Sequence, residues 1–96
     1  MAVSFKHKGT QDVFDAEDSK AARRTLPPHL HPKAAGVLDR LNAAVSLRSL
    51  SLPGLRLEAL KGDRAGQHSV RINDQYRVCF RWTESGAEDV EIVDYH

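Results

Sequence analysis

The chain is poor in several features that would assign a protein to a class at once. It has a single cysteine, Cys79, so no disulfide can form within it. No apolar run approaches the length of a membrane helix, and no charged start followed by an apolar stretch and a small-residue cleavage site marks a secretory signal. These absences argue against a disulfide-stapled scaffold and against a membrane association. They favour a reducing, cytoplasmic setting.

The common catalytic and cofactor motifs are missing as well. There is no P-loop, no G-x-S-x-G and no dinucleotide-binding fingerprint. His29 and His31 lie among prolines, with no cysteine or carboxylate at ligand spacing, so a zinc site is not expected. Cys79 lies in no activating motif and is predicted to be a small packed side chain. The sequence therefore predicts neither a metal nor a cofactor.

Length and charge limit the architecture. A chain of 96 residues predicts one domain, covering residues 1–96. The formal net charge is only +1, but the charges are unevenly distributed. Residues 56–81 carry six basic and three acidic side chains, whereas residues 82–96 carry five acidic side chains and no lysine or arginine. The basic and acidic segments can pair with each other, or the basic one can form an anion-binding face.

Apolar spacing in the first half of the chain predicts helices. One helix is expected to begin at Pro32, which suits a first helical turn, and to continue through an apolar stripe that ends at Val45. An earlier helix is expected with Thr10 as its N-cap, with Ser19 as a possible break. Pro27-Pro28 ends whatever precedes it, because consecutive prolines remove backbone donors and disfavour helical geometry.

After Gly54 the apolar period changes to two, which predicts strands. Helices followed by an antiparallel meander make an α+β fold. The expected strands are a short one at residues 3–6 and four later ones at residues 55–59, 69–73, 76–82 and 90–92.

The register of one hairpin follows from parity. Directly opposed residues share a face, and only an odd loop brings the apolar residues of both strands to one face. A three-residue loop at residues 73–75 places Val70 opposite Val78 and Arg71 opposite Arg77. Two facing arginines need an anion between them. That anion can be a carboxylate of the last strand, such as Glu91, or a phosphate held by the guanidinium fork.

Three groups of side chains are candidates for chemistry. Asp94-Tyr95-His96 ends the given sequence with three proton-active residues, which could do acid–base work or be a solvated end. Lys61 and Arg64 flank a tight turn that could hold a phosphate or carry ordinary surface charges. Glu58 precedes Lys61 by three residues and could be a salt-bridge partner or a base.

Five segments can be compared together with known families. They are Ser4-Phe5-Lys6-His7-Lys8-Gly9, Leu52-Pro53-Gly54-Leu55-Arg56-Leu57, Leu60-Lys61-Gly62-Asp63-Arg64 with Gly66, Tyr76-Arg77-Val78 and Asp94-Tyr95-His96. In this order and at this spacing they resemble the HigB toxins, which are plasmid-maintenance killer proteins of the RelE/ParE superfamily.

The resemblance implies a fold and a function. The fold is that of microbial ribonucleases, with N-terminal helices packed on a twisted antiparallel β-sheet. The function is that of a type II toxin, a ribosome-dependent mRNA endoribonuclease (mRNA interferase) that inhibits translation and growth without a metal. The implied partners are the ribosome with its mRNA, and a neutralising HigA-like antitoxin with a helix-turn-helix domain. Operator DNA would be bound only through the toxin–antitoxin complex.

The resemblance also implies roles for individual residues. Lys61 and Arg77 match positions that stabilise the phosphate and the transition state. The last three residues match a terminal catalytic cluster, in which His96 is an acid or base, Tyr95 a base-stacking or proton-transfer group, and Asp94 an orienting group or proton acceptor. Arg64 and Arg71 are expected to bind RNA phosphates.

Position 58 departs from the family pattern, which often has histidine there. Glu58 can accept a proton but, when ionised, cannot donate one. Two other functions stay open. One is a gyrase-poisoning ParE-like toxin without nuclease activity, and the other is a toxin-like fold that is kept for antitoxin binding and operon control.

Overall fold

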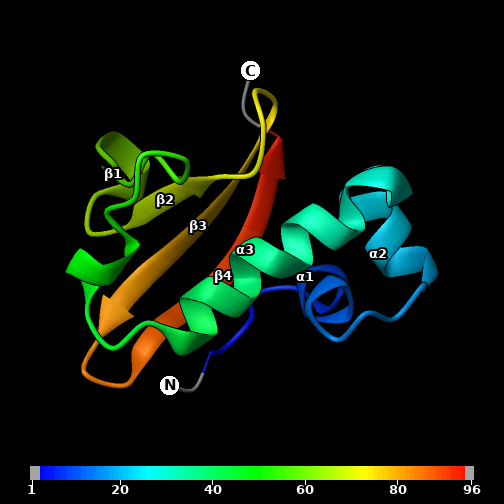
Figure 1. Cartoon of the computed structure of the whole chain (residues 1–96), viewed down its shortest axis with the longest axis horizontal. Coiled ribbons are helices and arrows are strands. Elements are labelled where there is room, and N and C mark those ends of the chain that lie inside the picture. The colour runs from blue at the N-terminus through cyan, green and yellow to red at the C-terminus, as the bar shows by residue number, and fades with distance from the viewer. Residues whose placement is uncertain (1–2, 95–96) are drawn as a thin grey trace.

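The computed structural model describes residues 3–94, in which helices come first and an antiparallel sheet follows (Figure 1). The described helices are α1 (Lys8–Phe14), α2 (Lys20–Thr25) and α3 (His31–Ala43), with short 3-10 turns η1 (Pro28–Leu30), η2 (Leu47–Leu50) and η3 (Gly62–Arg64). The strands are β1 (Glu58–Ala59), β2 (His68–Arg71), β3 (Tyr76–Thr83) and β4 (Gly86–Asp94), arranged in the order β1-β2-β3-β4. The predicted α+β class is confirmed. Within the described residues, no helix combines the length and apolar character needed to cross a membrane.

Helix α3 forms because its apolar residues recur on one side. It buries Ala34, Val37, Leu38 and Leu41, and Pro32 lies in its first turn as predicted. The predicted end at Val45 is wrong. The backbone becomes extended at Ala44, with ψ 129°, and leaves the Val45 side chain 78% exposed.

The first helical segment is divided in two. Ser19 is the N-cap of α2, and its hydroxyl accepts a hydrogen bond from the backbone N–H of Ala22 at 3.0 Å. The expected break at this position is therefore confirmed. The prediction that Thr10 caps a helix is wrong, because α1 begins at Lys8 and Thr10 lies inside it. The buried Thr10 hydroxyl instead accepts a hydrogen bond from the backbone N–H of Ile92 at 3.2 Å, which joins α1 to β4.

Helices α1 and α2 approach each other so closely that the contact requires glycine. A Cβ atom on Gly9 would lie 2.7 Å from the carbonyl oxygen of Ala21 and would also collide with the hydroxyl of Thr25. Real Cβ atoms do not come this close to a backbone oxygen. The close packing of α1 against α2 therefore explains why residue 9, the last of the Ser4–Gly9 segment, is glycine.

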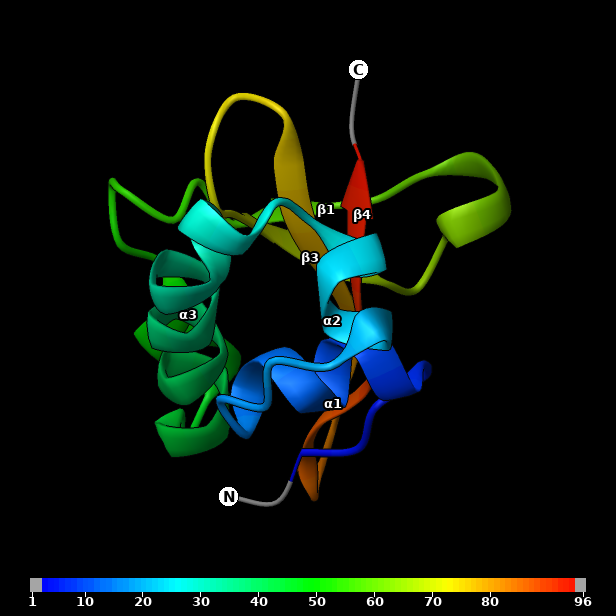
Figure 2. The same cartoon turned by 90° about the vertical axis from the view of Figure 1, so that its right-hand side faces the viewer.

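The predicted hairpin register is confirmed. Val70 lies opposite Val78 and Arg71 opposite Arg77, while the N–H of Ile72 donates to the carbonyl of Tyr76 at 2.9 Å. One face of the sheet joins the helices in the apolar core, with Val70, Ile72, Val78, Phe80 and Ile92 buried there. Figure 2 shows that the loop carrying η3 projects from the sheet on the side away from α3.

Two predicted strands are shorter than expected. Residues 3–6 form a single parallel bridge, Phe5 to Val90, instead of a strand. The strand predicted at 55–59 is reduced to β1, because Arg56 has a positive φ of 46° and turns the chain out of extended geometry.

A bulge in β4 changes which residues face the core. Arg81 lies opposite Glu88, but Cys79 lies opposite Glu91, so β4 carries one extra residue between these pairs. Asp89 in this stretch has a positive φ of 53°. An extra residue reverses the alternation of a strand. As a result, Glu91 faces the same side of the sheet as Cys79, while Val90 and Ile92 are buried in the core.

Candidate active site

The sheet face away from the core carries two rows of opposed residues. One row runs across all four strands, from Glu58 through Ser69 and Cys79 to Glu91. The neighbouring row contains Arg71, Arg77 and Val93. Of the predicted site residues, Glu58, Arg71 and Arg77 therefore lie together on this face.

Arg77 is the most firmly held cation of this face. Its Nε donates to the hydroxyl of Ser69 at 2.8 Å, and its Nη2 donates to the carbonyl of Arg56 at 2.7 Å. The strained backbone of Arg56 lies next to this bond, and such outliers are typical of functional sites. Nη2 also lies 3.9 Å from a carboxylate oxygen of Glu58. With its side chain only 12% exposed, Arg77 has a fixed orientation.

Among residues 3–94, the carboxylates that pair with the facing arginines come from the hairpin loop and from β1. Arg71 pairs with Asp74 in the hairpin loop, and Arg77 lies beside Glu58. The suggestion that Glu91 neutralises this pair is wrong. The bulge and the loop before β2 direct Glu91 to other cations instead.

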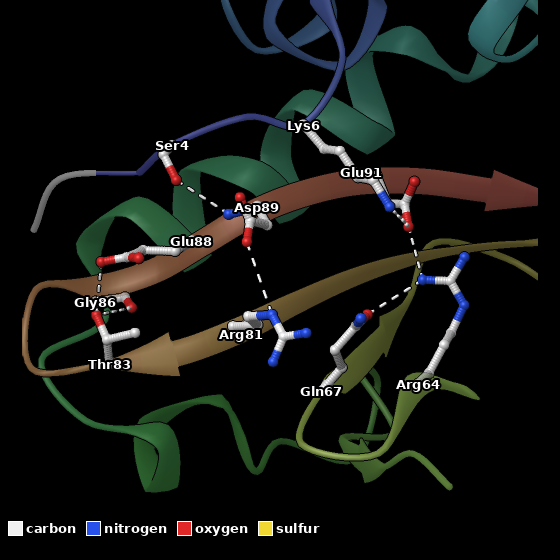
Figure 3. A network of polar contacts seen from close by, with 10 residues as sticks. All are labelled: Ser4, Lys6, Arg64, Gln67, Arg81, Thr83, Gly86, Glu88, Asp89 and Glu91. Carbon is white, nitrogen blue, oxygen red and sulfur yellow. Dashed lines mark hydrogen bonds and ion pairs between the residues drawn. The ribbon is translucent and has the colours of Figure 1, made fainter. Parts of the chain in front are cut away.

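Lys61 and Arg64 both lie in the turn between β1 and β2, but their side chains have different surroundings. Lys61 is exposed. Arg64 reaches over to β4, where its Nη1 lies 2.6 Å from Glu91, and it also donates to the side-chain oxygen of Gln67 at 3.1 Å (Figure 3). Arg64 thus contacts a carboxylate at the opposite edge of the sheet.

The terminal cluster is described only as far as Asp94, and Tyr95 and His96 lie outside the described residues. Asp94 is the last residue of β4, opposite Tyr76, and accepts a hydrogen bond from the side-chain amide of Gln75 at 3.2 Å. Val93, one residue earlier, lies opposite Arg77. Asp94 therefore lies one residue along β4 from the row that holds Arg77.

Two titratable groups of this face have shifted pKa values. Burial alone would raise the pKa of Glu91, but the hydrogen bond from Arg64 and the charges of Arg64, Lys6 and His7 outweigh it, and the pKa lies below its ordinary value. Burial raises the pKa of the Cys79 thiol, against the opposing charge of Arg64. Cys79 is fully buried and protonated at neutral pH, so it is a packed side chain as predicted.

Residues 3–94 contain no group of three or more histidine, cysteine, aspartate or glutamate side chains that could hold a metal ion. The chemistry available on this face is that of fixed cations beside a carboxylate. Such a set can stabilise a charged phosphate and accept a proton from a hydroxyl.

Three further groups contribute to this face and were not among the predicted site residues. Ser69 lies two residues before Arg71 on β2, so its side chain points to the same face of the sheet. The predicted hairpin register was therefore enough to place it on the polar face. The Arg56 carbonyl could not have been found, because its role depends on a turned backbone. The third is Glu91, whose place as the partner of Arg64 depends on a bulge with no local sequence signal.

The fold is shared with a solved bacterial complex. The structure superposes on a chain of the YoeB-YefM complex from Staphylococcus aureus with a TM-score of 0.63, covering 100% of this chain and 97% of that one. The two sequences are 16% identical, so this likeness concerns the fold alone. It defines the chain as an α+β protein with the architecture seen in that complex.

Sequence comparison gives the family. Residues 3–96 match the model of the RelE-like toxin of type II toxin-antitoxin system HigB, and the chain belongs to this family. It is 35% identical over 88 residues to Toxin HigB-1 of Vibrio cholerae, covering 91% of this chain and 90% of that protein. It is also 28% identical over 96 residues to Endoribonuclease HigB of Proteus vulgaris, covering 100% of both.

Proposed function

We propose that this toxin is an endoribonuclease that cuts mRNA on the ribosome without a metal, using the 2′-hydroxyl of the RNA as nucleophile. The observation that carries the proposal is the fixed guanidinium of Arg77, held by Ser69 and the Arg56 carbonyl beside the carboxylate of Glu58. The relative from Proteus vulgaris, which aligns over its whole length, is named an endoribonuclease.

The reaction requires three functions. A base must take the proton of the 2′-hydroxyl, a cation must stabilise the charged phosphorane, and an acid must protonate the leaving 5′-oxygen. Arg77 is placed for the second function, with the exposed Lys61 as a further cation. Glu58 supplies a carboxylate where the resemblance expects histidine, and we assign it the role of proton acceptor.

The acid is assigned to the terminal cluster. Val93 lies opposite Arg77, and Asp94, the last described residue, follows it directly. His96 is the candidate acid, Tyr95 a stacking or proton-transfer group, and Asp94 an orienting group. Arg71, across from Arg77, is proposed to bind a neighbouring RNA phosphate.

The ribosome is proposed to present the substrate. A formal net charge of +1 gives little attraction for free RNA, whose binding relies on many cations. The remaining partner is a HigA-like helix-turn-helix antitoxin, in keeping with membership of a toxin–antitoxin family. Operator DNA would be bound only through that complex, and the proposed site of action is the cytoplasm.

The direct test is to map RNA 5′ ends in a purified translation reaction, with and without the protein. We expect cuts in ribosome-bound mRNA, lost in Lys61→Ala and in a variant lacking residues 94–96. Lys33→Ala, which removes an exposed lysine from α3, is the matched control and should cut normally. Both inactive variants should keep the circular dichroism spectrum of the wild type.

Two outcomes would contradict the proposal. Intact transcripts together with a DNA-damage response on induction would favour gyrase poisoning, and neither kind of damage would favour a fold that only binds antitoxin. Full toxicity of a folded protein without its last three residues would likewise count decisively against the proposed nuclease mechanism.

A further inference from the structure

Glu91 is a buried carboxylate that the proposed reaction does not use. Its side chain is only 8% exposed, yet Arg64, Lys6 and His7 all lie beside it (Figure 3 draws Arg64 and Lys6). Arg64 Nη1 lies 2.6 Å from one oxygen, Lys6 Nζ 3.7 Å from the same oxygen, and His7 Nε2 3.3 Å from the other. Burying a carboxylate is costly. The partners of Glu91 offset that cost and fix the orientation of its side chain.

Arg64 connects this carboxylate to the turn that carries Lys61. Its backbone N–H donates to the carbonyl of Lys61 at 3.2 Å, so the two residues belong to one turn of η3. The base of the loop is closed by a hydrogen bond from Leu60 N–H to the carbonyl of Gln67 at 2.9 Å. The side chain of Gln67 also accepts from Arg64. These hydrogen bonds all join residues within the loop, whereas the contact of Arg64 with Glu91 joins the loop to β4.

Lys61 depends on that loop for its position. The Lys61 side chain is exposed, and the loop projects from the sheet on the side away from α3 (Figure 2). Electrostatic stabilisation of a transition state requires the cation to be in place before the reaction, and a shift of about 1 Å can cost 10²-fold in rate.

We propose that Glu91 is a positioning residue, which holds the turn 61–66 against β4 through Arg64 and so sets the place of Lys61. This inference rests on the proposed function. It also gives Arg64 a different role from the one expected, since its guanidinium anchors the loop to Glu91 and is not the ligand of an RNA phosphate.

The test compares RNA cleavage by the wild type, Glu91→Gln, Arg64→Gln and the double variant. Glutamine keeps the size of the Glu91 side chain but removes its charge. We expect each single variant to lower kcat about tenfold or more while KM changes less than about threefold, because substrate binding is kept and Lys61 is displaced. The double variant should lose no more than the worse single variant, since both changes break one contact.

Glu88→Gln is the matched control, because it removes a carboxylate from the same strand outside this cluster and should leave kcat unchanged. A folded Glu91→Gln protein with wild-type kcat would overturn the proposal, as would losses that multiply in the double variant. If Glu91→Gln is unfolded at the assay temperature, Arg64→Gln decides the question by the same kcat criterion.

A second readout separates this inference from the proposed function. Amide hydrogen exchange at residues 61–67 should be faster in Glu91→Gln than in the wild type, with exchange in α3 unchanged. If the wild type cuts no RNA, the proposed function fails, and faster exchange would still support the role of Glu91 in holding the loop. Unchanged exchange in these residues would overturn it.

Discussion

The Nη2 atom of Arg77 and a carboxylate oxygen of Glu58 lie 3.9 Å apart on one face of the sheet, although β2 separates their strands. Arg77 spans that gap because its guanidinium donates hydrogen bonds to the hydroxyl of Ser69 on β2 and to the carbonyl of Arg56, two residues before Glu58. Glu58 itself keeps 54% of its side chain exposed. The cation is thus fixed by other groups, and the carboxylate is accessible to a substrate hydroxyl.

Glu58→Gln should therefore abolish proton acceptance and leave the position of Arg77 intact. We expect kcat for RNA cleavage to fall about 10²- to 10⁴-fold, the usual contribution of a general base, with little change in thermal stability. Single-turnover cleavage on ribosomes measures this. Glu84→Gln, which removes an exposed glutamate from the turn between β3 and β4, is the control. Wild-type cleavage by Glu58→Gln would leave Glu58 as a salt-bridge partner only.

The Glu91 carboxylate should make the fold sensitive to acid. Because its pKa in the folded protein is lowered from an ordinary 4.5, the unfolded chain takes up this proton at higher pH than the folded one. The stabilisation is present above about pH 4.5 and is lost as the pH falls through the folded pKa. Urea unfolding at a series of acidic pH values should show a shallower loss of stability for Glu91→Gln than for the wild type. Parallel curves for the two proteins would contradict the assignment.

Gly9→Ala should weaken the contact of α1 with α2. The added methyl group would meet the Ala21 carbonyl at 2.7 Å, so the helices must separate, at a cost of about 1–3 kcal/mol. Gly36→Ala is the matched control, because nothing lies within 4 Å of that position on α3. There the change should stabilise by about 0.5–1 kcal/mol through helix propensity. Chemical unfolding of the two variants should give opposite signs, and a neutral Gly9→Ala would argue against the close approach.

Thr10→Val should remove the polar link between α1 and β4 without a change of shape. The backbone N–H of Ile92 would lose its acceptor in a buried place, which costs about 1–3 kcal/mol. Thr10→Ser keeps the hydroxyl, so hydrogen exchange at the Ile92 amide should be as slow as in the wild type and slower than in Thr10→Val. Equal exchange rates of that amide in the valine and serine variants would show that the hydrogen bond does not stabilise the contact between α1 and β4.

Local sequence patterns were sufficient to predict α3, the α+β class and the register of the hairpin formed by β2 and β3. The 3.6-residue spacing of Ala34, Val37, Leu38 and Leu41 and the position of Pro32 predicted α3, since these signals act within a few residues. Alternation and loop parity placed Arg71 opposite Arg77 with a three-residue loop, because only a loop with an odd number of residues keeps the apolar residues of both strands on one face. The motif residues Glu58, Lys61 and Arg77 were likewise visible in the sequence.

The pairing of charges was decided only in three dimensions. Glu91 meets Arg64, 27 residues earlier, because a bulge shifts the alternation of β4 and because the loop between β1 and β2 brings Arg64 within reach. Arg77 is oriented by the carbonyl of Arg56, whose positive φ has no sequence signal. Thr10 binds β4 instead of capping a helix because its hydroxyl finds a backbone donor there. Composition specifies which charges exist, but their partners depend on long-range geometry that no local period encodes.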